Sequence, residues 1–197
     1  MRKIGLLGGT FNPPHIGHLI IANEVKQALG LDEVRLMPTA IPPHKHNPTD
    51  ATPAQRLRMV QLAVEGTDGL MESSFEIDRG GVSYTYDTMR ALKEVEPETD
   101  FYFIIGGDMI DILPQWFQIE ALCKLVTFVG VQRPGSSGEQ SVIPVEFIDI
   151  PSIDLSSTMI RKRTEAGQSI QFLVPDPVIS YIRQEGLYGS TTAKRRT

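Results

Sequence analysis

Two histidines three residues apart, His15 and His18, carry the side chains best suited to chemistry in this sequence. They follow an apolar run at residues 3–7 and a glycine-rich turn at residues 8–11. Glycines let the backbone approach a ligand closely, and a helix start offers N–H groups and the positive end of the helix dipole. The spacing directs both imidazoles to one face of the first helical turn. The pattern predicts a phosphate site built from imidazole and backbone; an ordinary strand-to-helix turn with solvated or buried histidines is the alternative.

The glycine turn differs from the two common nucleotide-binding loops. A Walker A loop ends in Gly-Lys-Ser/Thr, and the dinucleotide fingerprint needs a third glycine at the helix start, where this sequence has Pro13 and Pro14. A zinc site is disfavoured because the histidines lack i,i+4 spacing, no glutamate follows at the expected place, and the single cysteine, Cys123, is distant. We therefore predict phosphate binding with no metal held by the protein.

A second group of polar residues, Ser156, Ser157 and Thr158, precedes Met159-Ile160-Arg161 near the other end of the chain. Hydroxyls and amides gather here at a predicted helix start, although a plain helix N-cap would use the same residue types. Arg161 lies one turn in, where a cation opposes the helix dipole, and a bound anion would offset that repulsion. Two phosphate sites suit a nucleoside triphosphate that is attacked by another phosphate.

These two motifs resemble the two signatures of a nucleotidyltransferase superfamily. The run GGTFNPPHIGH at residues 8–18 is similar to its (H/T)xGH signature, and SSTMIR at residues 156–161 is similar to SSTxIR, in the same order and at a similar separation. Within the superfamily the sequence most resembles the bacterial nicotinate-nucleotide adenylyltransferases. This further resemblance is carried by IPPHK at 41–45, SYTYDT at 83–88, GGDM at 106–109 and PQWF at 114–117.

The resemblance implies a reaction between ATP and nicotinate mononucleotide that yields nicotinate adenine dinucleotide (deamido-NAD) and pyrophosphate. The attacking 5′-phosphate is largely ionised at pH 7, since its second pKa is about 6, so the in-line attack needs neither a general base nor a covalent enzyme intermediate. Catalysis then consists of positioning and of neutralising charge. Mg²⁺ is expected as the cofactor, held mainly by ATP phosphates and water, because no carboxylate cage is visible in the sequence.

The resemblance also implies which residues act. His15, His18 and Arg161 are the expected catalytic residues, with the histidines on the α- and β-phosphates and the arginine on the outer phosphates. The residues expected to bind ATP are Gly8, Gly9, Thr10, Phe11, His15, His18, Gly106, Asp108, Ser156, Ser157, Thr158 and Arg161. Those expected to bind nicotinate mononucleotide are Lys45, Tyr84, Thr85, Asp108, Trp116 and Phe117.

Some of these assignments have structural alternatives. Trp116 suits stacking on the pyridine ring but would be equally ordinary in a core, and Asp108 suits ribose hydroxyls but also a helix N-cap. Lys45 is either a phosphate contact or a solvated loop lysine. No partner is predicted for His44 and His46.

Composition limits the remaining possibilities. The chain has 197 residues, a net charge of −5 and 41% hydrophobic residues, which fits one domain at 1–190 and argues against nucleic acid as the partner. No stretch approaches the ~20 apolar residues of a membrane span, and one cysteine fits a reducing cytoplasm. The basic tail at 191–197 is expected to be disordered. A homodimer is expected only because it is implied by the family that the sequence resembles.

Apolar and turn patterns predict alternating strands and helices. Strands are expected at 3–7, 33–37, 71–77, 101–105, 126–131 and 145–150, and helices at 18–29, 54–65, 85–95, 108–113, up to 125, and from 156 and 176. Such alternation, with nearly continuous apolar strands, predicts an α/β fold: a Rossmann-like, doubly wound, mainly parallel sheet with helices on both faces. Ligands bind such sheets at the carboxyl ends of the strands, where the first motif lies.

Two other functions remain as alternatives. One is a different adenylyltransferase of the superfamily, such as the phosphopantetheine type, against which the Pro-Pro-His form, the 41–45 run and the pair Trp116-Phe117 argue. The other is a non-catalytic nucleotide sensor, which we expect to have lost a histidine or arginine of the motifs; none is missing here.

Overall fold

A computed structural model describes residues 1–41, 51–82, 84–132, 141–151 and 153–190. Its centre is a six-stranded sheet in the order β3-β2-β1-β4-β5-β6, and every neighbouring pair is parallel. The chain reverses its winding direction between β1 and β4, which places a ligand crevice beyond their carboxyl ends. The strands are β1 (Arg2–Gly9), β2 (Glu33–Pro38), β3 (Leu70–Glu72), β4 (Thr99–Gly106), β5 (Val126–Gln132) and β6 (Val145–Asp149).

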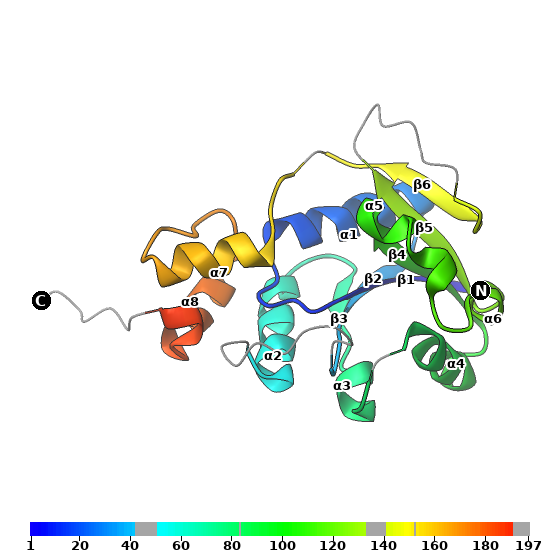
Figure 1. Ribbon diagram of the computed structural model, residues 1–197, viewed down its shortest axis with the longest axis horizontal. Coiled ribbons are helices and arrows are strands. Elements are labelled where there is room, and N and C mark those ends of the chain that lie inside the picture. Colours follow the sequence, from blue (N-terminus) through cyan, green and yellow to red (C-terminus); the bar gives the residue numbers. More distant parts are fainter. Residues whose placement is uncertain (42–50, 83, 133–140, 152, 191–197) are drawn as a thin grey trace, which may run out of the picture.

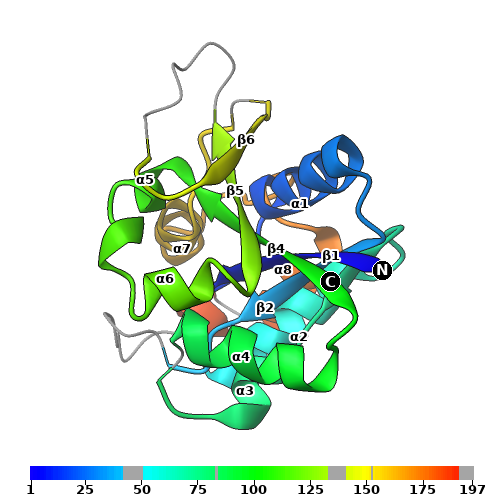
Figure 2. The same cartoon turned by 90° about the vertical axis from the view of Figure 1, so that its right-hand side faces the viewer.

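Helices cover both faces of the sheet because successive strand residues point to opposite faces and both sets are apolar. In β1, Leu6 packs in the cluster under α4, and Leu7 packs in the cluster under α1 and α2. Figure 2 shows α1 and α6 on opposite sides of the sheet. The predicted doubly wound α/β fold is confirmed. The helices beside the sheet are α1 (Ile16–Leu29), α2 (Pro53–Val64), α3 (Phe75–Arg79), α4 (Thr85–Val95), α5 (Gly107–Ile110), η1 (Leu113–Gln115) and α6 (Ile119–Leu122).

The C-terminal elements α7 (Ser157–Glu165), α8 (Asp176–Gln184) and η2 (Leu187–Gly189) form a third hydrophobic cluster with α2. They lie beyond the end of the sheet to which β1 runs, next to the start of α1 (Figure 1). The carboxyl ends of the central strands therefore face the start of α7. This arrangement brings the two sequence motifs to the same end of the molecule.

The strand predicted at 71–77 is wrong in most of its length. The chain forms β3 only to Glu72 and then turns into α3. The alternation of Met71, Phe75 and Ile77 with polar residues imitates a strand, but Ser74 Oγ donates to Asp78 Oδ2 at 2.6 Å and the Asp78 amide donates to the Ser74 carbonyl at 2.9 Å. These bonds between residues four apart stabilise a helical turn. The helix predicted at 108–113 is similarly divided into α5 and η1.

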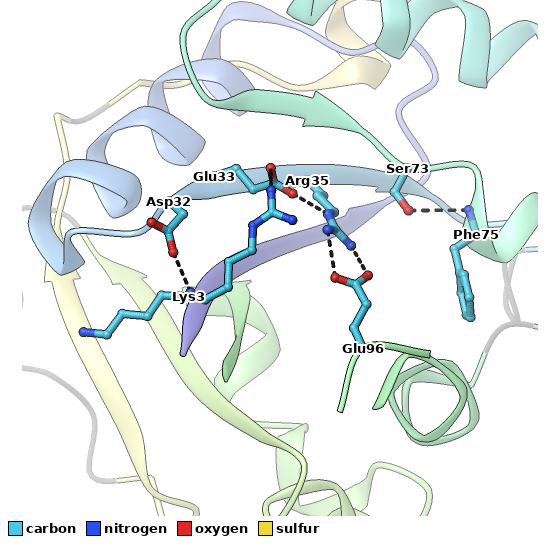
Figure 3. Close-up of polar contacts among 8 residues, drawn as sticks. Lys3, Asp32, Glu33, Arg35, Ser73, Phe75 and Glu96 are labelled. Atoms are coloured by element: carbon cyan, nitrogen blue, oxygen red, sulfur yellow. Dashed lines mark hydrogen bonds and ion pairs between the residues drawn. The ribbon is translucent and has the colours of Figure 1, made fainter. Parts of the chain in front are cut away.

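An ion-pair cluster fastens α4 to the opposite, amino-terminal end of the sheet (Figure 3). Arg35 on β2 donates from Nε to Glu33 at 2.6 Å and from its two terminal nitrogens to the carboxylate of Glu96 at 2.6 and 3.0 Å. Glu96 directly follows α4. The hydrogen bonds from Arg35 lower the pKa of Glu96 against the opposing effect of burial. The bidentate pair therefore holds the last turn of α4 against the sheet.

Candidate active site

The turn after β1 is shaped by an aromatic ring packed on bare backbone. A Cβ at Gly9 would lie 3.2 Å from Phe11 Cζ, so glycine lets the ring close over the strand end. Phe11 is buried and has a φ of 50°, a backbone region that few bulky residues adopt. Its ring meets the His18 ring in a T-shaped contact with centroids 4.9 Å apart. Phe11 thus forms a platform for the second histidine.

The two imidazoles of the first motif stack on one another. Their centroids lie 3.6 Å apart with 25° between the planes. The His15 amide donates to His18 Nδ1 at 3.0 Å, and the His18 amide donates to the His15 carbonyl at 2.9 Å. Gly17 leaves room for this arrangement, because a Cβ there would lie 3.0 Å from His15 Nδ1. The glycine between the histidines therefore lets His15 keep its stacked position, which a side chain at residue 17 would crowd.

Both imidazoles are neutral at pH 7. Burial lowers the pKa of His15 to about 4. Burial, and then the charge of His15, lower the pKa of His18 well below its ordinary value. Since His18 Nδ1 accepts a hydrogen bond, the proton of the neutral ring is on Nε2. The protein therefore offers a phosphate N–H donors at this point.

The start of α1 is partly satisfied within the protein. The Ile16 amide donates to the Leu173 carbonyl at 3.0 Å, and the His18 amide is bonded to His15. A helix start normally leaves such donors for a ligand or solvent. Two backbone amides of this helix start are thus already bonded within the protein. The imidazoles therefore supply more of the donors left for an anion than the sequence pattern alone indicates.

The second motif contacts the first directly. Ser157 Oγ donates to the Pro13 carbonyl at 2.8 Å, and Arg161 donates to the Asn12 carbonyl at 2.8 Å, across 144 and 149 residues of sequence. Ser156 is the N-cap of α7, and its hydroxyl accepts from the Met159 amide at 3.2 Å. The two motifs therefore form one polar junction at the carboxyl end of β1.

The guanidinium of Arg161 supplies positive charge at this junction. Its second terminal nitrogen donates to Thr158 Oγ1 at 3.2 Å. Within the described ranges no carboxylate lies at ion-pair distance from it. A surface recess of about 490 Å³ opens beside the start of α7. The recess is lined by Ser156, Thr158, Met159, Lys162, Arg163 and Gln168.

The segments assigned to the mononucleotide meet on the side of α4 and η1. The Tyr84 and Phe117 rings lie 5.2 Å apart, and both are about half exposed. Trp116 is partly buried, with its ring edge-on to Phe103 and Phe128 at 6.0 and 6.1 Å. Thr85 is the first residue of α4. The structure thus brings Tyr84 together with Phe117, while Trp116 packs on the core.

The structure describes some of the remaining residues predicted for the site, and others lie outside the described ranges. Gly106 ends β4 and Asp108 belongs to α5. The β1–β4 register that pairs Leu7 with Ile104 brings Gly106 level with Gly9, while Thr10 follows β1 with an exposed side chain. Lys45, and with it His44 and His46, lies outside the described residues.

Two residues that were not predicted from the sequence, Arg56 and Tyr188, are bonded to the loops that form the site. Arg56 is buried on α2 and donates to the carbonyls of Thr10, Thr39 and Ala40 at 2.9, 2.7 and 3.1 Å, so it links the loops that follow β1 and β2. Its place in the helical stripe of Met59, Val60 and Ala63 was a usable signal, because a cation on a buried face needs partners. Tyr188 is the other; its hydroxyl reaches Asn12, and no local pattern indicates this contact.

The described residues contain no group of three or more His, Cys, Asp or Glu side chains that could surround a metal ion. No helix among them is long and apolar enough to cross a membrane.

Comparison with known proteins places this architecture in a class. A family model described as cytidylyltransferase-like matches residues 6–163. Two structures of a Plasmodium falciparum nicotinic acid mononucleotide adenylyltransferase, complexed with NaAD and with APC, align with 97% of this chain and 99% of theirs, with TM-scores of 0.81 and 0.79 at 20% identity. Together the fold and the joined motifs define a nucleotidyltransferase of the cytidylyltransferase-like class.

Sequence relatives narrow the assignment. Probable nicotinate-nucleotide adenylyltransferases of Streptococcus pneumoniae and Geobacillus thermodenitrificans are each 50% identical to this chain, over 95% and 98% of it and 89% of their own lengths. One from Oceanobacillus iheyensis is 49% identical over 96% of this chain and 98% of its own. The chain belongs to the nicotinate-nucleotide adenylyltransferase family, as the sequence motifs predicted.

Proposed function

We propose that the protein transfers AMP from ATP to nicotinate mononucleotide, which yields nicotinate adenine dinucleotide and pyrophosphate for NAD biosynthesis. The observation that carries the proposal is the junction of the two motifs: Arg161 and Ser157 are bonded to the backbone of the loop that leads into the stacked histidines. The junction gathers neutral N–H donors and the guanidinium of Arg161, which has no carboxylate partner among the described residues, and this combination suits a triphosphate. Family membership supplies the mononucleotide as the partner.

In the proposed reaction a phosphate oxygen of the mononucleotide attacks the α-phosphorus of ATP. The new P–O bond forms as the bond from the α-phosphorus to the bridging oxygen breaks, and the electron pair leaves with pyrophosphate. His18 Nε2–H and the His15 imidazole bind the α- and β-phosphates; Arg161, with Thr158 beside it, binds the outer phosphates. Because the nucleophile is already ionised, these residues act by positioning it in line and by stabilising charge on the leaving group.

The metal is assigned to the substrate. The described part of the chain offers no cluster of carboxylates for a cation, and Mg²⁺ prefers phosphate oxygens and water in nucleotide sites. We therefore propose that Mg²⁺ enters with ATP. The glycine-rich turn at Gly8 and Gly9, together with Thr10, Gly106 and Ser156, would then lie around the nucleotide.

The acid form of the mononucleotide is the proposed substrate rather than the amide. A carboxylate only accepts hydrogen bonds, so a selective pocket needs donors and no nearby anion. Thr85, Trp116 and Phe117 bring hydroxyl, indole and backbone N–H groups without an acidic side chain. A carboxamide would direct its NH₂ at such donors and leave buried groups unpaired, at about 1–3 kcal/mol each. Tyr84 and Lys45 are proposed to complete this side of the site, and Asp108 is proposed to accept hydrogen bonds from the ribose hydroxyls, away from the carboxylate.

A pyrophosphate-release assay tests the function. The purified protein with Mg-ATP is offered nicotinate mononucleotide, its amide counterpart and 4′-phosphopantetheine, and we expect turnover with the acid at a kcat/KM at least tenfold above that of the amide. Turnover with phosphopantetheine alone would identify the other adenylyltransferase. Nucleotide binding without turnover would identify a sensor. We place the enzyme in the cytoplasm because its lone cysteine, Cys123, suits a reducing compartment.

A further inference from the structure

We propose that Tyr188 is a positioning residue for the transfer: its hydroxyl fixes Asn12 and so holds the loop that joins the two nucleotide motifs. The residue lies in η2, outside both motifs and 176 positions from Asn12 in sequence. The inference rests on the proposed function and adds to it a residue that acts through the loop without touching the substrates.

The contact is short and buried. Tyr188 Oη donates to Asn12 Oδ1 at 2.6 Å, and the two residues are 8% and 3% exposed. The same Oδ1 accepts from the Ala51 amide at 3.2 Å, while the Asn12 carbonyl accepts from Arg161 at 2.8 Å. Asn12 is therefore the point where η2, the start of α2 and the second motif all meet the first motif.

Tyr188 is held in position by its packing against the other C-terminal elements and α2. Its backbone has a φ of 56°, in the left-handed region that bulky residues rarely adopt. The ring packs in the third cluster, with buried neighbours that include Met59, Ile160 and Ile182. The ring thus belongs to the core of the C-terminal elements, and the hydroxyl at its far end is a separate feature that contacts the loop. Ring and hydroxyl are separable by mutation.

The loop has several attachments to the C-terminal segment, and the bond from Tyr188 reaches a side chain of the loop, that of Asn12. Ser157 binds the Pro13 carbonyl, and the Leu173 carbonyl accepts from the Ile16 amide at 3.0 Å. These bonds fix backbone on either side of the histidines. Without the tyrosine hydroxyl, the Asn12 side chain would turn more freely and its carbonyl would move relative to Arg161. Displacements of about 1 Å cost up to a hundredfold in rate where in-line geometry matters.

The test compares two tyrosines of the same C-terminal cluster. Tyr188→Phe removes the hydroxyl and keeps the ring. Tyr181→Phe is the matched control, since Tyr181 packs on the same cluster from α8 and its hydroxyl makes no hydrogen bond within the described structure. We expect Tyr188→Phe to raise the KM for ATP and lower kcat, so that kcat/KM for ATP falls about tenfold, with the KM for the mononucleotide within twofold of wild type. Tyr181→Phe should match wild type.

A second variant removes the other partner of the same hydrogen bond, the Asn12 side chain on the loop. Asn12→Ala should lower kcat/KM for ATP, and adding Tyr188→Phe to it should cause no further loss, because the bond is already gone. This arm also decides the question if Tyr188→Phe alone folds poorly. Wild-type kcat and KM in the folded fraction of Tyr188→Phe, or fully additive losses in the double variant, would overturn the proposal.

Calorimetric binding of a non-hydrolysable ATP analogue separates this proposal from the proposed function. Wild-type protein that releases no pyrophosphate would refute the function. Weaker analogue binding by Tyr188→Phe than by Tyr181→Phe would still support the positioning of the loop, and equal binding by the two variants would refute it.

Discussion

The stacked pair His15 and His18 sets the electrostatics of the site at the scale of single residues. Because burial keeps both rings neutral, the permanent positive charge near them comes from Arg161, which is bonded to a carbonyl and a hydroxyl. Neutral N–H donors lose less hydration than cations when they are buried. The site can therefore be closed and preorganised before the triphosphate arrives.

We expect His18→Ala to retain the fold and to lower kcat by roughly 10²–10³, the usual cost of losing one preorganised donor to a developing charge. The His18 ring contacts the His15 and Phe11 rings and belongs to none of the three hydrophobic clusters, so its removal leaves those clusters intact. Steady-state kinetics with both substrates and circular dichroism provide the measurement. Near-normal turnover by a folded variant would remove His18 from the mechanism.

The lowered pKa of His15 predicts a loss of stability in mild acid. Its pKa is about 4 in the folded protein against 6.5 without burial, so between these values the unfolded chain binds more protons. The contribution of this residue to the free energy of unfolding is thus complete above pH 6.5 and falls as the pH drops toward 4. Between pH 7 and 5 the loss is about 2 kcal/mol.

Urea unfolding of wild type and His15→Gln at pH 7 and pH 5 measures this loss. The substitution also changes packing, so the quantity compared is the change in unfolding free energy between the two pH values within each protein. It should be about 2 kcal/mol smaller in the variant. Equal changes in the two proteins would show that His15 titrates normally in the folded state.

At the scale of elements, α4 depends on the ion pair at its end. Arg35 makes two hydrogen bonds to Glu96, and hydrogen bonds between charged groups contribute about 1.5–3 kcal/mol. We expect Glu96→Gln to lower the free energy of unfolding by about 1–2 kcal/mol at pH 7, because the glutamine amide is neutral and its single oxygen can accept only one of the two hydrogen bonds at full geometry. Glu94→Gln is the control, since that exposed side chain makes no ion pair among the described residues.

The pH dependence of the same variant checks the cause. Arg35 lowers the pKa of Glu96 from 4.5 in the folded protein, so the stabilisation is present above 4.5 and is lost as the pH falls through the folded pKa. The difference between wild type and Glu96→Gln should therefore shrink as the pH is lowered below 4.5 through the folded pKa. A difference that stays unchanged down to acid unfolding would point to packing instead of charge.

Elements with strong local signals could be predicted from the sequence, and others could not. The apolar runs gave β1, β4 and β5, and Thr52-Pro53 marks the start of α2, where Thr52 accepts from the Gln55 amide. The strand predicted at 71–77 was wrong because the pattern of three apolar side chains overlaps a helical turn in which Phe75 packs against the core. Only the packing of that face on the sheet decides between the two structures.

For the candidate site, too, the local motifs could be predicted from the sequence, whereas the contacts between them could not. Its motifs are local in sequence, and the parallel fold places both at the carboxyl end of β1. The bonds that join them are not local: Tyr188 to Asn12 depends on how α8 and η2 pack, and no pattern near either residue encodes it. Arg56 was closer to prediction, because an arginine in an apolar helical stripe indicates a buried partner.

For the whole molecule, α2 joins the sheet to the C-terminal elements. Val60 and Val64 on α2 belong to the cluster against the sheet, while Met59 and Ala63 belong to the cluster with α7 and α8. Leu19 of α1 packs against both clusters. Separating the C-terminal elements would expose Ile160, Val178 and Ile182, each fully buried, at a cost of about 1.5–3 kcal/mol per side chain.

We therefore expect residues 1–190 to unfold as one cooperative unit. Trp116 is the only tryptophan and lies on the face of the sheet away from α2, so its fluorescence reports the sheet, whereas far-ultraviolet circular dichroism also reports α7 and α8. The two thermal transitions should coincide, with calorimetric and van't Hoff enthalpies equal. A non-hydrolysable ATP analogue should raise the single midpoint, because it binds the folded state at the junction of the motifs. An early loss of helix signal with native Trp116 fluorescence would show instead that the C-terminal elements separate first, and the analogue would then raise that first transition more than the second.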